Sequence, residues 1–73
     1  MTDHVYKSIE ITGSSSAGLE PAITGAIERA GDSLHNLRWF KVTDIRGQLD
    51  GSKVEYWQVT LKVGFTLDEN ADD

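Results

Sequence analysis

Three side chains in the second half of the chain could together hold a flat, polar and phosphorylated ligand. Trp39 offers a wide, electron-rich surface for stacking, and the amide of Gln58 presents a hydrogen-bond donor beside an acceptor. Such an amide can form two hydrogen bonds with a heterocycle that carries adjacent N–H and C=O groups. The planar guanidinium of Arg46 could donate hydrogen bonds to a phosphate. Alternatively, Trp39 packs in the core while Gln58 and Arg46 face water. The residue pattern alone favours this second interpretation.

No catalytic constellation accompanies these three residues. The chain has no cysteine, and no serine follows the nucleophile-elbow pattern. His4 and His35 lie far apart in sequence, without further ligands at zinc-like spacing. The carboxylates Asp44, Asp50 and Glu55 have no obvious partner for acid–base work. We therefore expect neither an enzyme nor a metal site.

A long antiparallel hairpin from about residue 39 to residue 67 must position the candidate site. Its return strand alternates strictly, which is typical of a strand with one buried face. One face carries Trp57, Val59, Leu61, Val63, Phe65 and Leu67, and the other carries Gln58, Thr60, Lys62, Gly64 and Thr66. The Asp50-Gly51 pair between the two legs predicts a type I′ turn, in which both central residues have positive φ.

The outgoing leg of this hairpin changes its parity part-way along. Phe40 and Val42 share one parity, whereas Ile45 and Leu49 share the other. Because a slip of one residue turns every later side chain to the opposite face, we expect a β-bulge near residues 43–44. Bulges are frequent beside functional sites, since they re-aim side chains.

The first half of the chain predicts one strand followed by one helix. Residues 5–12 alternate and are rich in β-branched and aromatic types. The Gly-Ser run at residues 13–16 breaks the pattern, and we interpret it as a set of helix N-caps rather than a phosphate loop. The helix is expected from about residue 17 to residue 34, with Pro21 in its first turn.

One face of this expected helix is apolar and the other is polar. The apolar positions are Leu19, Ile23, Ala26, Ile27, Ala30, Leu34 and Leu37, and the polar stripe is Glu20, Thr24, Glu28 and Asp32. Gly25 and Gly31 lower helix stability, and close packing against the sheet or against a neighbouring subunit could explain them. The predicted fold is α+β, in the order β-α-β-β, with a three-stranded antiparallel sheet around one helix.

The chain is short and acidic. Its 73 residues predict a single domain over 1–73, with an ordered core at about 4–67 and an acidic tail at 68–73. A domain of this size buries only about 60% of its unfolded surface, and without disulfides self-association is the expected source of further burial. The net charge of −5 argues against nucleic acid as a partner. No segment resembles a membrane span or a signal peptide, so we expect a soluble, cytoplasmic protein.

Taken together, these segments resemble bacterial dodecins over residues 5–67. The resemblance rests on the combined spacing of several short motifs rather than on any one of them. They are Tyr6-Lys7 before Ile-Glu-Ile, Gly13 with the Ser run, Trp39-Phe40-Lys41-Val42, Ile45-Arg46-Gly47, Tyr56-Trp57-Gln58-Val59 and Val63-Gly64-Phe65.

The resemblance implies a non-catalytic flavin-binding protein that assembles into a hollow homododecamer. Paired flavins, either FMN or riboflavin, would stack against Trp39 and bond through their pyrimidine edge to Gln58. Arg46 would contact a flavin phosphate, and Asp44, Gly47 and Gln48 would border the ribityl chain. The implied role is flavin storage, sequestration and photoprotective quenching. A self-assembling scaffold without a physiological flavin remains the alternative.

Two positions depart from the family pattern. Many bacterial members carry an Arg where this chain has Thr66, and some carry a Lys where it has His4. Both positions are associated in the family with phosphate or coenzyme A contacts. We therefore extend no coenzyme A site to this chain, and we expect weaker discrimination between riboflavin and FMN.

Overall fold

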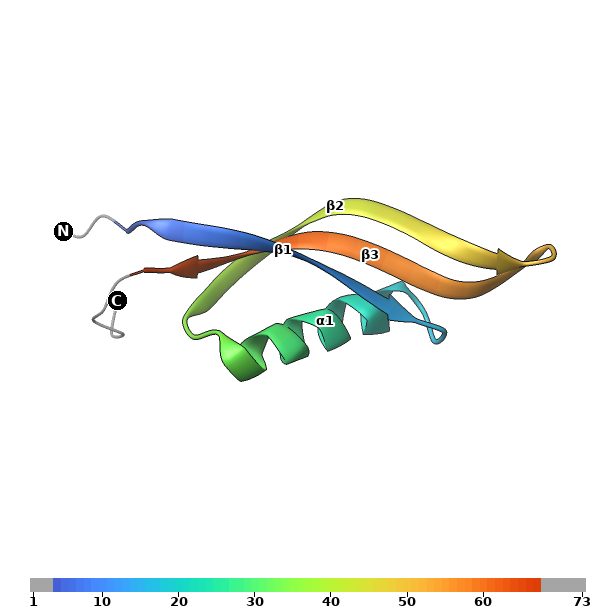
Figure 1. Ribbon diagram of the computed structural model, residues 1–73, viewed down its shortest axis with the longest axis horizontal. Helices are drawn as coiled ribbons and strands as arrows, with labels where there is room; N and C mark the ends of the chain where they lie inside the picture. Colours follow the sequence, from blue (N-terminus) through green and yellow to red (C-terminus); the bar gives the residue numbers. More distant parts are fainter. Residues whose placement is uncertain (1–3, 68–73) are drawn as a thin grey trace.

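The chain folds into a three-stranded antiparallel sheet with one helix on one face (Figure 1). The structure is a computed structural model and describes residues 4–67. Its elements are β1 (Tyr6–Ser15), α1 (Leu19–Ser33), β2 (Leu37–Asp50) and β3 (Lys53–Thr66), and the strand order is β1-β3-β2. The predicted β-α-β-β order and antiparallel sheet are confirmed. The last strand is the central one and pairs with both others.

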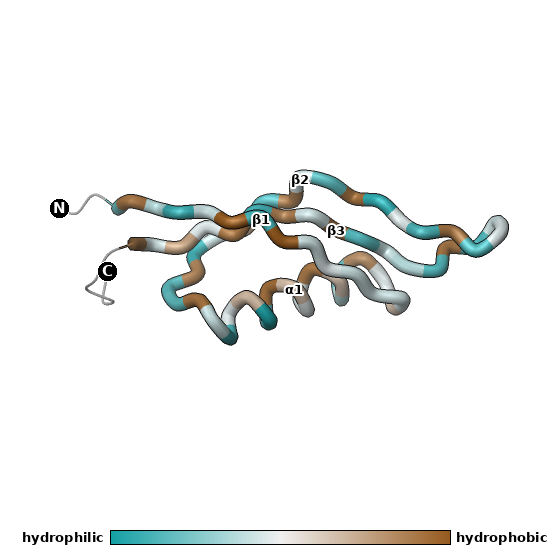
Figure 2. Tube along the Cα trace, viewed as in Figure 1, coloured by the Kyte–Doolittle hydropathy of each residue, from teal (hydrophilic) through white to brown (hydrophobic). Residues whose placement is uncertain are grey.

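The core lies between α1 and the middle of β3. Val59, Leu61 and Val63 are fully buried, and Ala22 of α1 packs against them. Figure 2 shows this apolar stretch of β3 next to the helix. Trp57 and Leu67 have the same parity as the buried residues but are exposed, because α1 covers only the middle of the strand. The sequence pattern predicted the buried face but not how far the helix would cover it.

The Gly-Ser run does not cap the helix, so this prediction was wrong. Residues 13–15 continue β1, and Ser14 and Ser15 pair with Gln58 and Trp57 of β3. Helix α1 begins after Gly18, which makes no side-chain capping hydrogen bond. Ser15 Oγ instead accepts a hydrogen bond from the backbone N–H of Ala17 at 3.0 Å. Because Ser14 and Ser15 belong to β1, they precede the first turn of α1 and do not cap it.

Gly13 allows α1 to approach β1 closely. A Cβ at this position would overlap the carbonyl oxygen of Ala22 and would lie 2.8 Å from the Cβ of Ala26. The helix therefore crosses directly above the backbone of the strand. By contrast, a Cβ on Gly25 would meet nothing within 4 Å among the described residues, so packing against this sheet does not account for Gly25.

The β2–β3 hairpin confirms the predicted bulge and corrects the predicted turn. The register shifts between Val42 and Asp44, as the change of parity indicated. The loop consists of Gly51 and Ser52, and of the residues around it only Gly51 has positive φ, at 64°. Positive φ at the first central residue alone fits a type II′ turn, not the type I′ turn expected at Asp50-Gly51. The hairpin extends well beyond α1 (Figure 1).

Candidate functional site

Trp39 lies on the sheet face opposite the helix, which we call the open face. It is paired with Gly64 of β3, and the next residue, Val63, is buried against α1. Because successive side chains of a strand point to opposite faces, Trp39 and Gly64 both belong to the open face. The interpretation that Trp39 packs in the core is wrong, since 41% of this residue is exposed.

Gly64 lets the indole of Trp39 lie flat across β3. A Cβ on Gly64 would overlap the indole, with its Cδ2 atom only 2.6 Å away. One face of the indole thus covers the glycine backbone, and the side chain remains accessible from the other side. Tyr6 approaches with its ring edge, at a centroid distance of 6.3 Å and an interplanar angle of 65°. Backbone and Tyr6 hold the indole as a fixed, flat surface.

Gln58 and Arg46 form a second group on the open face. They are directly opposite each other in β3 and β2. The Nε of Arg46 lies 3.8 Å from Oδ2 of Asp44, and both side chains are largely exposed, at 66% and 56%. Such a pair in water contributes little to stability. The Arg46 cation therefore remains open to a ligand, although a carboxylate lies near it.

The bulge brings Asp44 and Arg46 onto the same face as Trp39. Without the bulge, continued alternation from Trp39 would place Thr43 and Ile45 on the open face and turn Asp44 and Arg46 to the other face. The hydroxyl of Thr43 donates a hydrogen bond to the carbonyl oxygen of Thr60 at 3.1 Å, which anchors the bulge to β3. The inference that the bulge re-aims candidate site residues agrees with this geometry.

The two groups are too far apart to share one ring within a single chain. Gly64, opposite Trp39, and Gln58 are six positions apart in β3, which corresponds to about 20 Å along a strand. This exceeds the length of a three-ring heterocycle. A ring that stacks on Trp39 and bonds to Gln58 therefore needs these residues from two copies of the chain.

The remaining candidates lie further along the hairpin. Gln48 donates a hydrogen bond from Nε2 to Oε1 of Glu55 at 3.1 Å, so its amide is already engaged. A Cβ on Gly47 would lie 3.0 Å from the carbonyl oxygen of Tyr56, which shows a close approach of the two strands. Gly47 is thus a packing position between β2 and β3.

Sequence reasoning placed Gly64 and Lys62 on the same strand face as Gln58 but gave them no part in the site, and it did not place Tyr6 and Lys41 on this surface. A glycine inside a strictly alternating strand often marks the close approach of another group, and this signal could have identified Gly64. Lys41 and Lys62 needed the register, since only pairing shows that they face each other. Tyr6 needed the strand order, because β1 and β2 are not adjacent.

The sequence and the fold of this chain have known relatives. The dodecin family model matches residues 5–68. The chain is 48% identical over 65 residues to a dodecin from Thermus thermophilus, covering 89% of this chain and 94% of that protein. This chain belongs to the dodecin family. The resemblance noted from the sequence is confirmed.

Solved dodecin structures agree closely with this one. The dodecin of Streptomyces davaonensis superposes with a TM-score of 0.87 at 48% identity, covering 93% of this chain and all of that one. The Streptomyces coelicolor dodecin gives a TM-score of 0.87 at 43% identity, covering 96% and 100%. A calcium-chelating dodecin from Mycobacterium tuberculosis is more distant, with a TM-score of 0.76, 31% identity and coverage of 90% and 94%.

Residues 4–67 of this dodecin contain neither a cluster of metal ligands nor a helix that could span a membrane. The described part of the chain contains no cluster of three or more His, Cys, Asp or Glu side chains that could hold a metal ion. Over the same residues, no helix is long and apolar enough to cross a membrane.

Proposed function

We propose that this dodecin is a non-catalytic flavin-binding protein that stores and sequesters FMN or riboflavin. The observation that carries the proposal is the indole of Trp39, which lies flat on the backbone of Gly64 and keeps one side open. A flat aromatic surface of this kind stacks with planar heterocycles. A tryptophan that merely filled the core would not lie exposed over a glycine on the open face.

The residues present fit a flavin. The Gln58 amide can pair with the adjacent N–H and C=O groups of the pyrimidine edge, and it lies half-buried on the same face as Trp39. Bound flavin would supply a ring that becomes a strong oxidant on absorbing light. The Trp39 indole, in contact with that ring, can donate an electron and take it back. Light energy would then be lost without net chemistry, which is photoprotective quenching.

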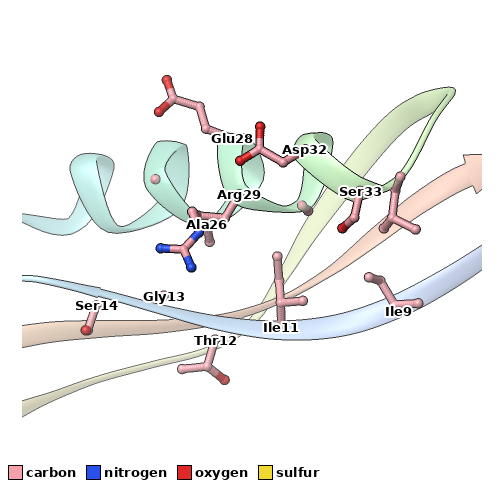
Figure 3. A pocket seen from close by; sticks show the side chains of 13 residues that line it. Ile9, Ile11, Thr12, Gly13, Ser14, Ala26, Glu28, Arg29, Asp32 and Ser33 are labelled. Atoms are coloured by element: carbon pink, nitrogen blue, oxygen red, sulfur yellow. The ribbon is translucent and has the colours of Figure 1, made fainter.

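Completion of the site by a second copy links binding to assembly, for which we propose the homododecamer implied by the family. Two surfaces of the chain are available for self-association. One is the hairpin arm, residues 44–57, whose large apolar side chains are exposed: Ile45, Leu49, Val54, Tyr56 and Trp57. The other is an open groove of about 1040 Å³ between α1 and β1. In Figure 3 Arg29 extends from α1 into this groove, whereas Glu28 points away from it.

The exposed hairpin arm also supports the alternative function. Its apolar side chains would favour self-association whether or not a ligand is bound, so a scaffold without a physiological flavin is the second candidate. An enzyme is disfavoured, because a ring between two protein surfaces would be closed to a substrate. A measurement of flavin binding distinguishes the two candidate functions, because only the storage protein should bind flavin.

A fluorescence titration of riboflavin and FMN with the purified protein tests the proposal. We expect saturable quenching near one flavin per chain. In Trp39→Ala, lost stacking should weaken binding by roughly tenfold to a hundredfold, taking about 1–3 kcal/mol for an aromatic stack. Phe40→Ala is the matched control, because Phe40 is an exposed aromatic residue on the opposite face and lies outside the hairpin arm. Normal quenching by Trp39→Ala would refute the site, and no quenching by the unmodified protein would favour the scaffold.

A further inference from the structure

The rings of Tyr6 and Trp39 meet across the open face, although their strands are not neighbours. β3 lies between β1 and β2, and Tyr6 pairs with Thr66 of β3 whereas Trp39 pairs with Gly64. Because Gly64 has no side chain, the indole can cross β3 and reach the phenol ring, at a centroid distance of 6.3 Å and an interplanar angle of 65°. Trp57, the other tryptophan, contacts no aromatic ring of residues 4–67.

Two rings in this arrangement can exchange an electron. Tyrosine and tryptophan are the aromatic side chains that lose one electron most readily, and transfer between rings this close needs no bridging group. At neutral pH a phenol that loses an electron also loses its proton, which makes tyrosine slightly easier to oxidise than tryptophan. The favourable direction is therefore from Tyr6 to an oxidised Trp39.

Tyr6 is also placed to release its proton and to be reduced again. It is 47% exposed, and its hydroxyl makes no hydrogen bond among the described residues, so water can accept the phenolic proton. The indole of Trp39 has one side on the backbone of Gly64 and offers its other side to the ligand. A water-soluble reductant can thus reach Tyr6 while both sides of the indole are covered.

We propose that Tyr6 is a redox relay, which returns an electron to Trp39 when the indole is left oxidised. This inference rests on the proposed function and adds a repair step to it. When dioxygen takes up the electron that Trp39 has donated and becomes superoxide, that electron does not return. Tyr6 then passes one electron to the indole radical and its phenolic proton to water, and the indole N–H regains any proton that it had lost. A thiol or ascorbate restores Tyr6 by giving up one electron and one proton.

Pulse radiolysis of the flavin-free full chain tests the relay. Azide radicals take one electron from tryptophan, and Trp57→Phe in every protein leaves Trp39 as the one tryptophan. Indole and phenoxyl radicals absorb at different wavelengths. We expect the indole radical to decay as the phenoxyl radical grows, at a rate independent of protein concentration. Tyr6→Phe keeps a ring and removes the oxidisable hydroxyl, so this growth should be lost. Tyr56→Phe, which changes the other tyrosine, should keep it.

Illumination of the riboflavin-loaded protein in air is the second measurement, with oxidised Trp39 quantified by mass spectrometry. Tyr6→Phe should accumulate this product several-fold faster than Tyr56→Phe. Absence of phenoxyl growth in the parent protein, growth that survives Tyr6→Phe, or equal accumulation of oxidised Trp39 in the two variants would overturn the relay. The radiolysis needs no flavin, so the two failures are distinguishable: absence of quenching in the flavin titration would refute the proposed function instead.

Discussion

The orientation of Trp39 depends on Gly64, the residue opposite it. The indole occupies the space that the Cβ of any other residue at position 64 would fill. The glycine on β3 therefore determines the side-chain orientation of Trp39 on β2. In sheets, an aromatic ring over a cross-strand glycine also covers backbone that would otherwise be exposed to water. Gly64 is accordingly as much a part of the candidate site as Trp39.

Gly64→Ala should weaken flavin binding while Trp39 is still present. The added methyl would overlap the indole and force it off the strand, so the flat surface would be lost. We expect roughly a tenfold or greater loss of affinity for both flavins, which is comparable to removal of one aromatic stack. Titration of each flavin, followed by the quenching of its fluorescence, measures this loss of affinity.

Gly51→Ala serves as a comparison for this variant, because Gly51 is at the hairpin tip with nothing within 4 Å of its Cβ position. Its φ of 64° predicts some loss of stability but no loss of affinity. Unchanged flavin binding by Gly64→Ala would contradict the assigned orientation of Trp39.

At the residue scale, the sequence suggested candidate residues and predicted the bulge, but it did not give the distances between those residues. Side-chain types singled out Trp39, Gln58 and Arg46, and the change of parity predicted the bulge that places Arg46 on the open face. The pattern could not show that Trp39 and Gln58 are separated within one chain, because this distance depends on the register between β2 and β3. The flavin contacts of all six candidate residues stay predictions.

At the element scale, the contact between α1 and β1 depends on small residues. Gly13 lies beneath Ala22 and Ala26, and the absence of a side chain lets the helix approach the strand backbone. The alanines at the contact are buried or half-buried, as expected of a tightly packed crossing. The sequence analysis assigned Gly13 to a helix-capping run and so missed this role.

Gly13→Ala should destabilise the protein substantially. The methyl would overlap the Ala22 carbonyl oxygen, and overpacking of this kind costs typically 1–3 kcal/mol. Gly25→Ala is the matched control in α1, where open space and a better helix former predict a gain of up to about 1 kcal/mol. Chemical denaturation of both variants gives the two values. Equal stability of the two would contradict the close helix–strand approach.

The order and type of the elements were predictable, whereas their junctions were not. Hydrophobic alternation in β3 and three- and four-residue spacing in α1 are strong local signals. Residues 13–15 are poor strand formers by composition, and they extend β1 only because β3 offers a long partner. The turn type differed because Gly51 occupies the first loop position rather than the second.

At the scale of the whole molecule, the chain leaves a large part of its apolar surface without cover. The hairpin arm extends past the helix, and Leu49 and Val54, which are register partners, are 63% and 49% exposed. Only Ala22, Ala30, Val59, Leu61 and Val63 form the buried apolar core of the described residues. So small a core is marginal for an isolated domain, and burial of the arm against other copies would supply the rest.

Leu49→Glu/Val54→Lys should shift the protein toward smaller species. The two charges are opposite in sign and directly paired, so they are tolerated within one hairpin but oppose burial of the arm. Sedimentation velocity should show a large assembly for the unmodified chain and a lower mass for the variant. Lys53→Gln, a polar change on the same arm, should leave the mass unchanged. A monomeric unmodified protein at micromolar concentration would contradict the proposed assembly.

The position of β3 has a consequence for synthesis in the cell. Its fourteen residues are translated after the other elements of the described fold, yet they lie between β1 and β2 and hold every fully buried large side chain of that fold. Until β3 has left the ribosome, β1 and β2 have no strand to pair with and α1 has no core to cover. Prematurely ended chains would then remain unfolded substrates for proteolysis and would not enter the assembly. The strand order thus makes the folding of each copy depend on its last described strand.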